Sequence, residues 1–135
     1  MSDKKIVVSG KRKTAVAKAT IEVGNGVVTF NRKPLSFLSE LQKLEISEPL
    51  ILAKDFLGDL KFDISLNVKG GGMACQVEAG RLAIAKAIVK FVGDENLKNA
   101  FLAYDRNMLI ADTRRKEDCK PGDSKARAMR QTSFR

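Results

Sequence analysis

The stretch KFDISLNVKGGGMACQVEAGRLAIAKAIVKFV, residues 61–92, decides the fold, because two different hydrophobic periods meet in it. Over residues 61–69 apolar and polar side chains alternate, which is the pattern of a strand with one face on a core. After three glycines, residues 73–92 are apolar around much of a helical circumference, which predicts a helix largely buried against a sheet. The side chains expected to face the core are Phe62, Ile64, Leu66 and Val68 in the strand, and Met73, Val77, Leu82, Ile84, Ala85, Ile88, Val89, Phe91 and Val92 in the helix.

Strands are also predicted before this stretch. Residues 15–23 alternate in the same way, and residues 6–9 form a shorter candidate strand ahead of them. The Gly-Asn-Gly at residues 24–26 joins residues 15–23 to the apolar residues 27–31, and Asn and Gly tolerate positive φ. We therefore expect residues 15–23 and 27–31 to form a β-hairpin.

The remaining periodic segments predict helices and one more strand. Residues 32–58 have helical spacing, with candidate helix starts at Pro34 and at the Ser-Glu-Pro of residues 47–49. Residues 94–104 predict another helix, and residues 107–112 are a candidate last strand.

Strands followed by a helix packed across them predict an α+β fold, a two-layer domain. The periodic pattern stops after residue 112. We therefore divide the chain into a globular domain, residues 1–112, which includes a basic N-terminal segment, and an extended basic C-terminal tail, residues 113–135.

The charge is concentrated at the two ends of the chain. The net charge of the 135 residues is +9; residues 1–33 carry eight Lys and Arg against two acids, residues 113–135 carry eight against three, and residues 34–112 carry nine against eleven. Basic ends on a nearly neutral body favour nucleic acid as the partner. There is no membrane-spanning run and no signal peptide, so we expect a cytoplasmic protein without a membrane partner.

The residue types argue against catalysis. The chain has no histidine, which excludes the usual Cys/His zinc patterns and the Ser/His or Cys/His nucleophile pairs. We expect Cys75 to be a small buried side chain and Cys119, in a polar stretch, to be exposed. Asp59 and Asp63 are a candidate carboxylate pair, but Asp63 lies on the outward face of its strand. We expect no enzyme activity, no metal, no cofactor and no small-molecule substrate.

The segment GKRKTA, residues 10–15, is a candidate phosphate contact. Its spacing fails the phosphate-loop pattern. Three consecutive cations in so basic a protein nevertheless favour contacts with phosphates over a solvated basic turn. These cations are Lys11, Arg12 and Lys13.

The segment VKGGGMA, residues 68–74, is a second candidate. A strand leads through Gly70, Gly71 and Gly72 to a helix N-terminus, where unpaired N–H groups attract anions and a phosphate backbone can approach closely. The alternative is a tight turn that binds nothing. Cys75 stands where the dinucleotide fingerprint would need its third glycine.

The tail ends in SKARAMRQTSFR, with four basic side chains and no acid. Extended at ~3.3–3.6 Å per residue, these twelve residues reach roughly 40 Å. Such an arm can thread between RNA helices while its cations neutralise phosphates. Contacts of this kind supply affinity and positioning rather than sequence choice.

Three ordered motifs make the chain resemble the ninth small-subunit ribosomal protein family over essentially its whole length. They are SGKRKTAVAKATIEVGNGVVTFN (residues 9–31), VKGGGMACQVEAGRLAIAKAI (residues 68–88) and DTRRKEDCKPGDSKAR (residues 112–127), followed by a terminal arginine. The resemblance implies the fold of the second domain of the fifth small-subunit ribosomal protein, with a left-handed βαβ crossover. The penultimate Phe134, where bacterial members have lysine, resembles the archaeal and eukaryotic branch.

The resemblance also implies the partners. The chain would bind ribosomal RNA in the head of the small subunit beside neighbouring head proteins, and its tail would reach the peptidyl-site tRNA. The residues implied to contact ribosomal RNA are Lys11, Arg12, Lys13, Arg114, Arg115, Lys116, Lys120, Lys125, Arg127 and Arg130. Arg135 would contact the tRNA, and Phe134 would add a stacking contact at the tail end.

Two other functions are compatible with parts of the pattern. One is a small-molecule kinase, indicated by the glycine turn and the shared fold, although the chain is short for one. The other is a free-standing RNA-binding factor that visits ribosomes or tRNA transiently. ATP binding would identify the first, and the absence of stoichiometric association with ribosomes would identify the second.

Overall fold

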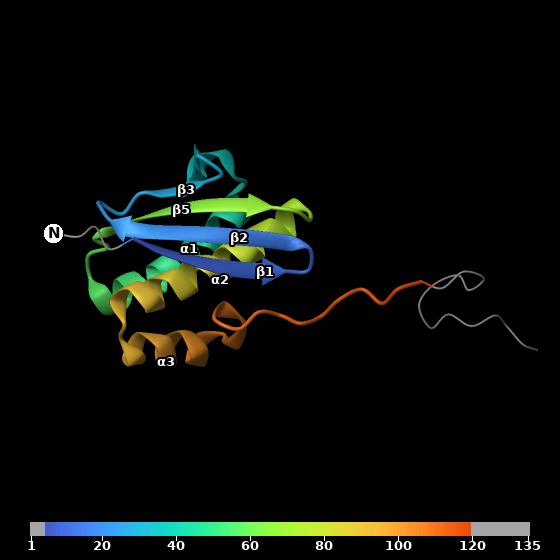
Figure 1. Ribbon diagram of the computed structural model, residues 1–135. Helices are drawn as coiled ribbons and strands as arrows, with labels where there is room; N and C mark the ends of the chain where they lie inside the picture. Colours follow the sequence, from blue (N-terminus) through green and yellow to red (C-terminus); the bar gives the residue numbers. More distant parts are fainter. Residues whose placement is uncertain (1–4, 120–135) are drawn as a thin grey trace, which may run out of the picture.

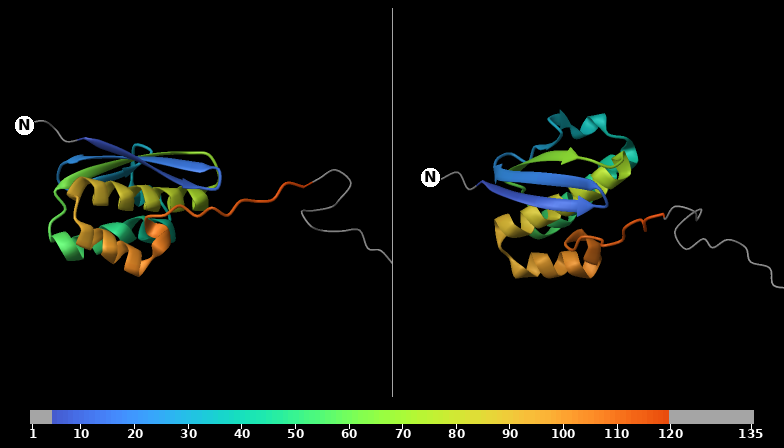
Figure 2. Two further views of the ribbon diagram at one scale, coloured as in Figure 1. Left: turned by 60° about the horizontal axis from the view of Figure 1, so that its bottom comes forward. Right: turned by 45° about the vertical axis from the view of Figure 1, so that its right-hand side comes forward.

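The computed structural model describes residues 5–119, which form a five-stranded sheet with three helices on one of its faces (Figure 1, Figure 2). The strands are β1 (Ile6–Arg12), β2 (Ala15–Val23), β3 (Val28–Phe30), β4 (Lys33–Pro34) and β5 (Phe62–Lys69). The helices are α1 (Glu40–Leu57), α2 (Met73–Val92) and α3 (Glu95–Tyr104), with 3-10 turns at Leu35–Phe37 and Arg106–Met108. The predicted α+β class is confirmed.

Strand β5 separates two strands that were expected to pair. The strand order is β1-β2-β5-β3-β4, so β2 and β3 are each neighbours of β5 and not of one another. The predicted hairpin of residues 15–23 and 27–31 is therefore wrong. The reason is a long-range contact: Asp63 of β5 accepts hydrogen bonds from the backbone N–H groups of Asn25 and Val27, at 2.9 and 2.8 Å. This carboxylate holds the Gly-Asn-Gly turn around the beginning of β5.

The first two strands form the hairpin instead. Arg12 lies opposite Ala15 across a turn of Lys13 and Thr14, and Lys13 adopts a φ of 52°. Strand β1 thus continues past the predicted end at residue 9. Lys11 and Arg12 lie within the strand and point to opposite faces of the sheet.

Helix α1 makes a crossover between two parallel strands. Strands β3 and β5 pair in parallel, and α1 connects them in sequence. In Figure 1 β5 runs to the right, β3 lies above it, and α1 passes behind the sheet. The crossover is therefore left-handed, which is rare for such units, as the resemblance implied.

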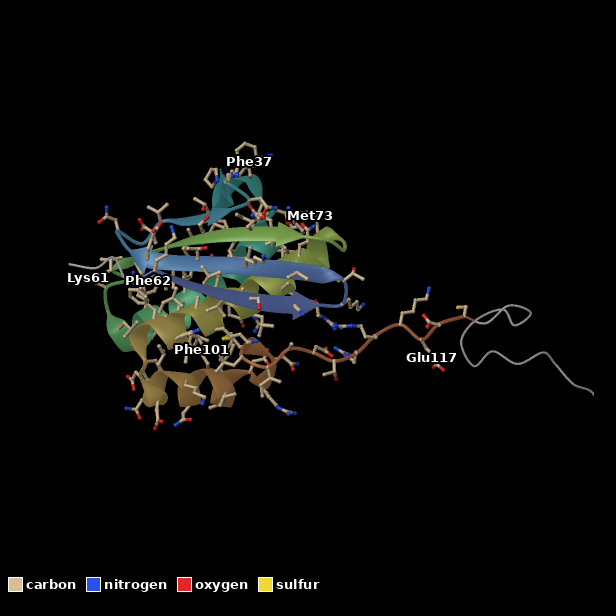
Figure 3. The ribbon with its side chains drawn as sticks, in the orientation of Figure 1. Phe37, Lys61, Phe62, Met73, Phe101 and Glu117 are labelled. Carbon is tan, nitrogen blue, oxygen red and sulfur yellow. The ribbon has the colours of Figure 1, made fainter. Side chains whose placement is uncertain are left out.

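Helix α2 lies between the sheet and the other two helices (Figure 2). Its buried residues are Val77, Ala79, Gly80, Leu82, Ala83, Ile84, Ala85, Ala87 and Ile88. Small side chains let it approach the sheet closely: a Cβ placed on Gly10 of β1 would lie 2.5 Å from the carbonyl oxygen of Ala79. The predicted burial of this helix and of the inward face of β5 is confirmed. Met73 is the exception and is 48% exposed (Figure 3), because burial of α2 begins further along the helix.

Helix α1 is one continuous helix, so the start predicted at residues 47–49 is wrong. A capping box formed by Ser39 and Gln42 begins it. Pro49 lies inside the helix, where it removes one backbone hydrogen bond. Its ring is fully buried in the core, and this apolar burial offsets the loss.

The strand predicted at residues 107–112 is also wrong. A 3-10 turn at Arg106–Met108 occupies its beginning, and Met108 is fully buried. Leu109 is partly buried against the core and Ile110 is 43% exposed, and the segment is not one of the five strands of the sheet. No helix within residues 5–119 is long and apolar enough to cross a membrane.

Candidate nucleic-acid interface

The basic turn divides its three cations between two environments. Lys11 and Lys13 are exposed, whereas the side chain of Arg12 is only 14% exposed and points to the helical side of the sheet. The alternation of a strand causes this division. Lys11 and Lys13 are therefore free to meet phosphates, and Arg12 is held within the protein.

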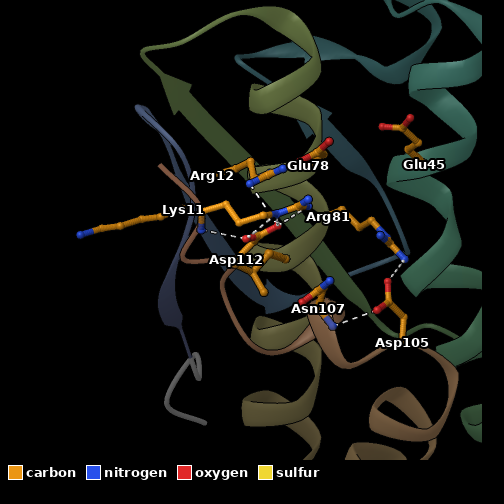
Figure 4. A pocket seen from close by; sticks show the side chains of 10 residues that line it. Lys11, Arg12, Glu45, Glu78, Arg81, Asp105, Asn107 and Asp112 are labelled. Carbon is orange, nitrogen blue, oxygen red and sulfur yellow. Dashed lines mark hydrogen bonds and ion pairs between the residues drawn. The ribbon is translucent and has the colours of Figure 1, made fainter. Parts of the chain in front are cut away.

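Arg12 joins the hairpin to the beginning of the tail (Figure 4). Its guanidinium pairs with Glu78 of α2, and its Nη1 lies 3.2 Å from Oδ2 of Asp112. Asp112 also accepts hydrogen bonds from Nη2 of Arg114 at 2.7 Å and from the Arg114 backbone N–H at 2.9 Å. These bonds from Arg114, helped by the charge of Arg12, hold the pKa of Asp112 well below its usual range. The cluster positions the chain where the tail leaves the domain.

A second arginine connects the three helices. Arg81 of α2 pairs with Glu48 of α1 and, through Nη2, with Oδ2 of Asp105 at 3.0 Å. Glu48 also accepts a hydrogen bond from the hydroxyl of Tyr104 at 2.7 Å, which raises the pKa of that hydroxyl. The two arginine clusters line one polar cavity of about 280 Å³. Three of the four cations that line it, Arg12, Arg81 and Arg114, are paired with carboxylates and hold the domain together, whereas the fourth, Lys11, is exposed and available to an anion.

The glycine turn packs against the β1–β2 turn. Gly70 and Gly71 have φ values of 80° and 66°, and a Cβ on Gly70 would lie 2.5 Å from the carbonyl oxygen of Thr14. The positive φ values and this packing require glycine at both positions without any ligand, and the predicted approach of phosphate to Gly70 and Gly71 stays a prediction. Gly72 differs, because nothing lies within 4 Å of its Cβ position and it gives α2 no side-chain cap. The N-terminus of α2 is therefore open at Gly72, and its predicted contact with phosphate stays a prediction.

Two further lysines, Lys18 and Lys69, lie on the uncovered face of the sheet and are not among the predicted contacts. Lys11 and Lys69 lie opposite Val16 on either side, and Lys18 follows on the same face of β2. All three lysines are exposed. The sequence shows that Lys18 and Lys69 alternate with apolar residues of their own strands. The three lysines lie close together only because β2 lies between β1 and β5. The sheet thus adds Lys18 and Lys69 to the predicted Lys11.

The predicted basic features meet at one end of the molecule. The β1–β2 turn, the glycine turn after β5 and the beginning of the tail all lie at the right-hand end in Figure 1. Arg114, Arg115 and Lys116 are exposed there, although Arg114 also pairs with Asp112. Glu117 lies further along the tail (Figure 3). The other predicted contacts lie outside the described residues: Lys120, Lys125, Arg127, Arg130, Phe134 and Arg135.

The two cysteines and Asp63 were further candidates for chemistry in the sequence. Cys119 is exposed, as expected, whereas Cys75, which was expected to be buried, is only partly buried against the core. The carboxylate of Asp63 caps the turn before β3. Within residues 5–119, no group of three His, Cys, Asp or Glu side chains is placed to hold a metal ion.

Comparison with known proteins agrees with the motifs. Residues 10–135 match the family described as Ribosomal protein S9/S16. The chain is 46% identical over 129 residues to the small ribosomal subunit protein uS9 of Methanococcus maripaludis strain C5, which covers 93% of this chain and 95% of the relative. It is 45% identical over 129 residues, with the same coverage, to the protein of that name from Methanococcus vannielii. The chain therefore belongs to the ribosomal protein S9/S16 family.

Proposed function

We propose that this protein is a structural component of the small ribosomal subunit in the cytoplasm, where it binds ribosomal RNA in the head. In this proposal its C-terminal tail reaches the peptidyl-site tRNA. The relatives are named as small ribosomal subunit proteins. The observation that carries the proposal is the gathering of exposed cations, an open helix N-terminus and the tail at one end of the domain.

The charges favour a phosphate backbone as the ligand. Lys11, Lys13, Lys18 and Lys69 belong to the turn and to the uncovered sheet face, and their ammonium groups reach phosphates without reading bases. The open N–H groups after Gly72 supply a further anion contact. The domain would thus anchor the protein on RNA, and the anchored Asp112 would direct the tail.

The RNA contacts are tested with lysine variants and a matched control. Lys11→Ala and Lys69→Ala should each weaken binding to a small-subunit head RNA fragment and lower the slope of log K against log salt by about 0.7–0.9 per lost phosphate contact. Lys98→Ala on α3, also exposed but on the helical side, should leave both unchanged. Equal effects of all three variants would contradict an interface at the sheet.

The tail is tested in assembled subunits. A chain without residues 124–135 should still be incorporated at one copy per small subunit, because the domain and Asp112 remain. Its subunits should release peptidyl-site tRNA faster than wild-type subunits. Unchanged tRNA affinity would contradict the tail assignment. Failure of the full-length protein to sediment with small subunits after a high-salt wash would indicate a transient RNA-binding factor instead.

A further inference from the structure

Helix α1 carries apolar side chains on its outer face, although its inner face already packs in the core. Leu41, Leu44 and Ile51 are 75%, 62% and 55% exposed. They recur at helical spacing and form one stripe with Glu48 and Asp55 between and after them. Leu41, Leu44 and Ile51 lie outside the core, and exposed apolar side chains gathered on one face mark interaction sites.

Tyr104 of α3 turns this stripe into a groove. Its hydroxyl donates a hydrogen bond to Oε1 of Glu48 at 2.7 Å, which holds the half-exposed ring beside α1. The groove has a volume of about 500 Å³. It is lined by Leu44, Glu45, Glu48, Ile51, Leu52 and Tyr104. Its floor is apolar and its rim bears carboxylates.

The groove carries unbalanced negative charge on a protein of net charge +9. Glu48 is paired with Arg81. Glu45 is exposed and also lines the polar cavity that contains Arg81, but its carboxylate makes no hydrogen bond or ion pair with the other described residues. Helical spacing places Lys43 and Lys54 on the flank of α1 away from Tyr104. A ligand in the groove therefore meets a carboxylate that is not held in a direct ion pair with another described residue.

We infer that the groove between α1 and α3 is the docking site of a basic segment of another protein, which inserts a large apolar side chain between Leu44, Ile51 and Tyr104 and places a Lys or Arg against Glu45. The inference rests on the proposed function, in which the neighbours include other proteins of the small-subunit head. RNA is disfavoured because its phosphates would face Glu45. A second copy of the chain is disfavoured because a two-fold contact would bring Glu45 close to its own equivalent.

The test uses a photoreactive benzoylphenylalanine in assembled small subunits, in place of Leu44 in one variant and of Lys11 in another. The docking site predicts that the probe at position 44 cross-links to a protein, at a segment with an apolar residue flanked by Lys or Arg. Cross-links to RNA or to a second copy would overturn the inference, as would no cross-link from subunits that contain the variant. The probe at position 11 reports separately on the proposed function, which predicts a cross-link to RNA.

The charge argument is tested with a matched pair of reversals. Glu45→Lys should reduce the yield of the protein cross-link from position 44 roughly tenfold, since it replaces an attraction with a repulsion. Glu95→Lys, a reversal of another exposed carboxylate in the first turn of α3, should leave the yield unchanged. Both chains should keep the wild-type circular dichroism spectrum. Equal yields from the two variants would overturn the role of Glu45.

Discussion

Gly10 tests the close packing of β1 on α2, and Gly80, which faces side chains of β3 and β5, is its control, because the same change at each should have opposite effects. A Cβ at Gly10 would lie 2.5 Å from the carbonyl oxygen of Ala79 and 2.8 Å from the backbone nitrogen of Ala83. Both atoms belong to the backbone of α2 and cannot rotate away. At Gly80, within α2, the nearest atoms to a Cβ are side-chain carbons at 3.6 and 3.7 Å, which is ordinary contact.

The magnitudes follow from these distances. Overpacking at Gly10→Ala costs about 1–3 kcal/mol, and the reduced entropy of the unfolded chain returns about 0.4–1 kcal/mol. A net loss of about 1–2 kcal/mol remains for Gly10→Ala. Gly80→Ala removes the helix penalty of glycine and should stabilise the protein by about 1 kcal/mol.

The assay is unfolding of the full chain by heat and by urea, followed by circular dichroism at 222 nm. For a domain of this size, about 1 kcal/mol corresponds to a change in Tm of about 4 °C. Gly10→Ala should therefore lower the Tm by about 4–8 °C and Gly80→Ala should raise it by about 4 °C. A Gly10→Ala protein as stable as the wild type would refute the close approach of β1 and α2. A Gly80→Ala protein that is equally destabilised would contradict the room for a Cβ beside Leu66 and Phe30.

Three further perturbations address the ion pairs and the helix cap. Because the pKa of Asp112 is lowered in the folded state, the contribution of this carboxylate to stability is complete above its unfolded pKa of about 4 and is lost as the pH falls below that value. In urea titrations, the difference in unfolding free energy between the wild type and Asp112→Asn should therefore shrink as the pH falls below about 4. Arg81→Met leaves Glu48 and Asp105 without their cation and should lower the unfolding free energy at pH 7 by about 2–3 kcal/mol. A loss smaller than the error of the urea titration would contradict the role of Arg81 in connecting the three helices. Ser39→Ala removes the side-chain cap of α1 and should cost about 1 kcal/mol in the same assay, and no change would show that the capping box is not needed.

Long periodic segments were predictable because their local pattern agrees with their surroundings. The alternation of β5 and the apolar circumference of α2 each extend over several turns or residue pairs, and both elements form as expected. Pro49 shows the opposite case, because its local preference to begin a helix is overridden by burial in the core. The apolar residues before Asp112 predict a strand, yet Met108 fills the core from a 3-10 turn.

The candidate interface was predictable in composition but not in geometry. Lys11 and Arg12 are adjacent cations in the sequence, and only the pairing of β1 directs one to solvent and the other to Glu78 and Asp112. The sequence shows Lys69 only as an outward residue of its strand. The sheet places this strand beside β2, which carries Lys18. A count of charges cannot separate these roles, because each depends on a partner distant in the chain.

The sequence by itself determined the elements with long hydrophobic periods, the concentration of positive charge at both ends and the motifs shared with the ribosomal protein S9/S16 family. These properties are local or additive, so they can be read from neighbouring residues. The tertiary structure alone decided that β5 lies between β2 and β3, that Arg12 holds the beginning of the tail, and that α1 and Tyr104 form a groove. Each of these depends on contacts between residues far apart in the chain, whose partners are selected by the packing of the whole domain.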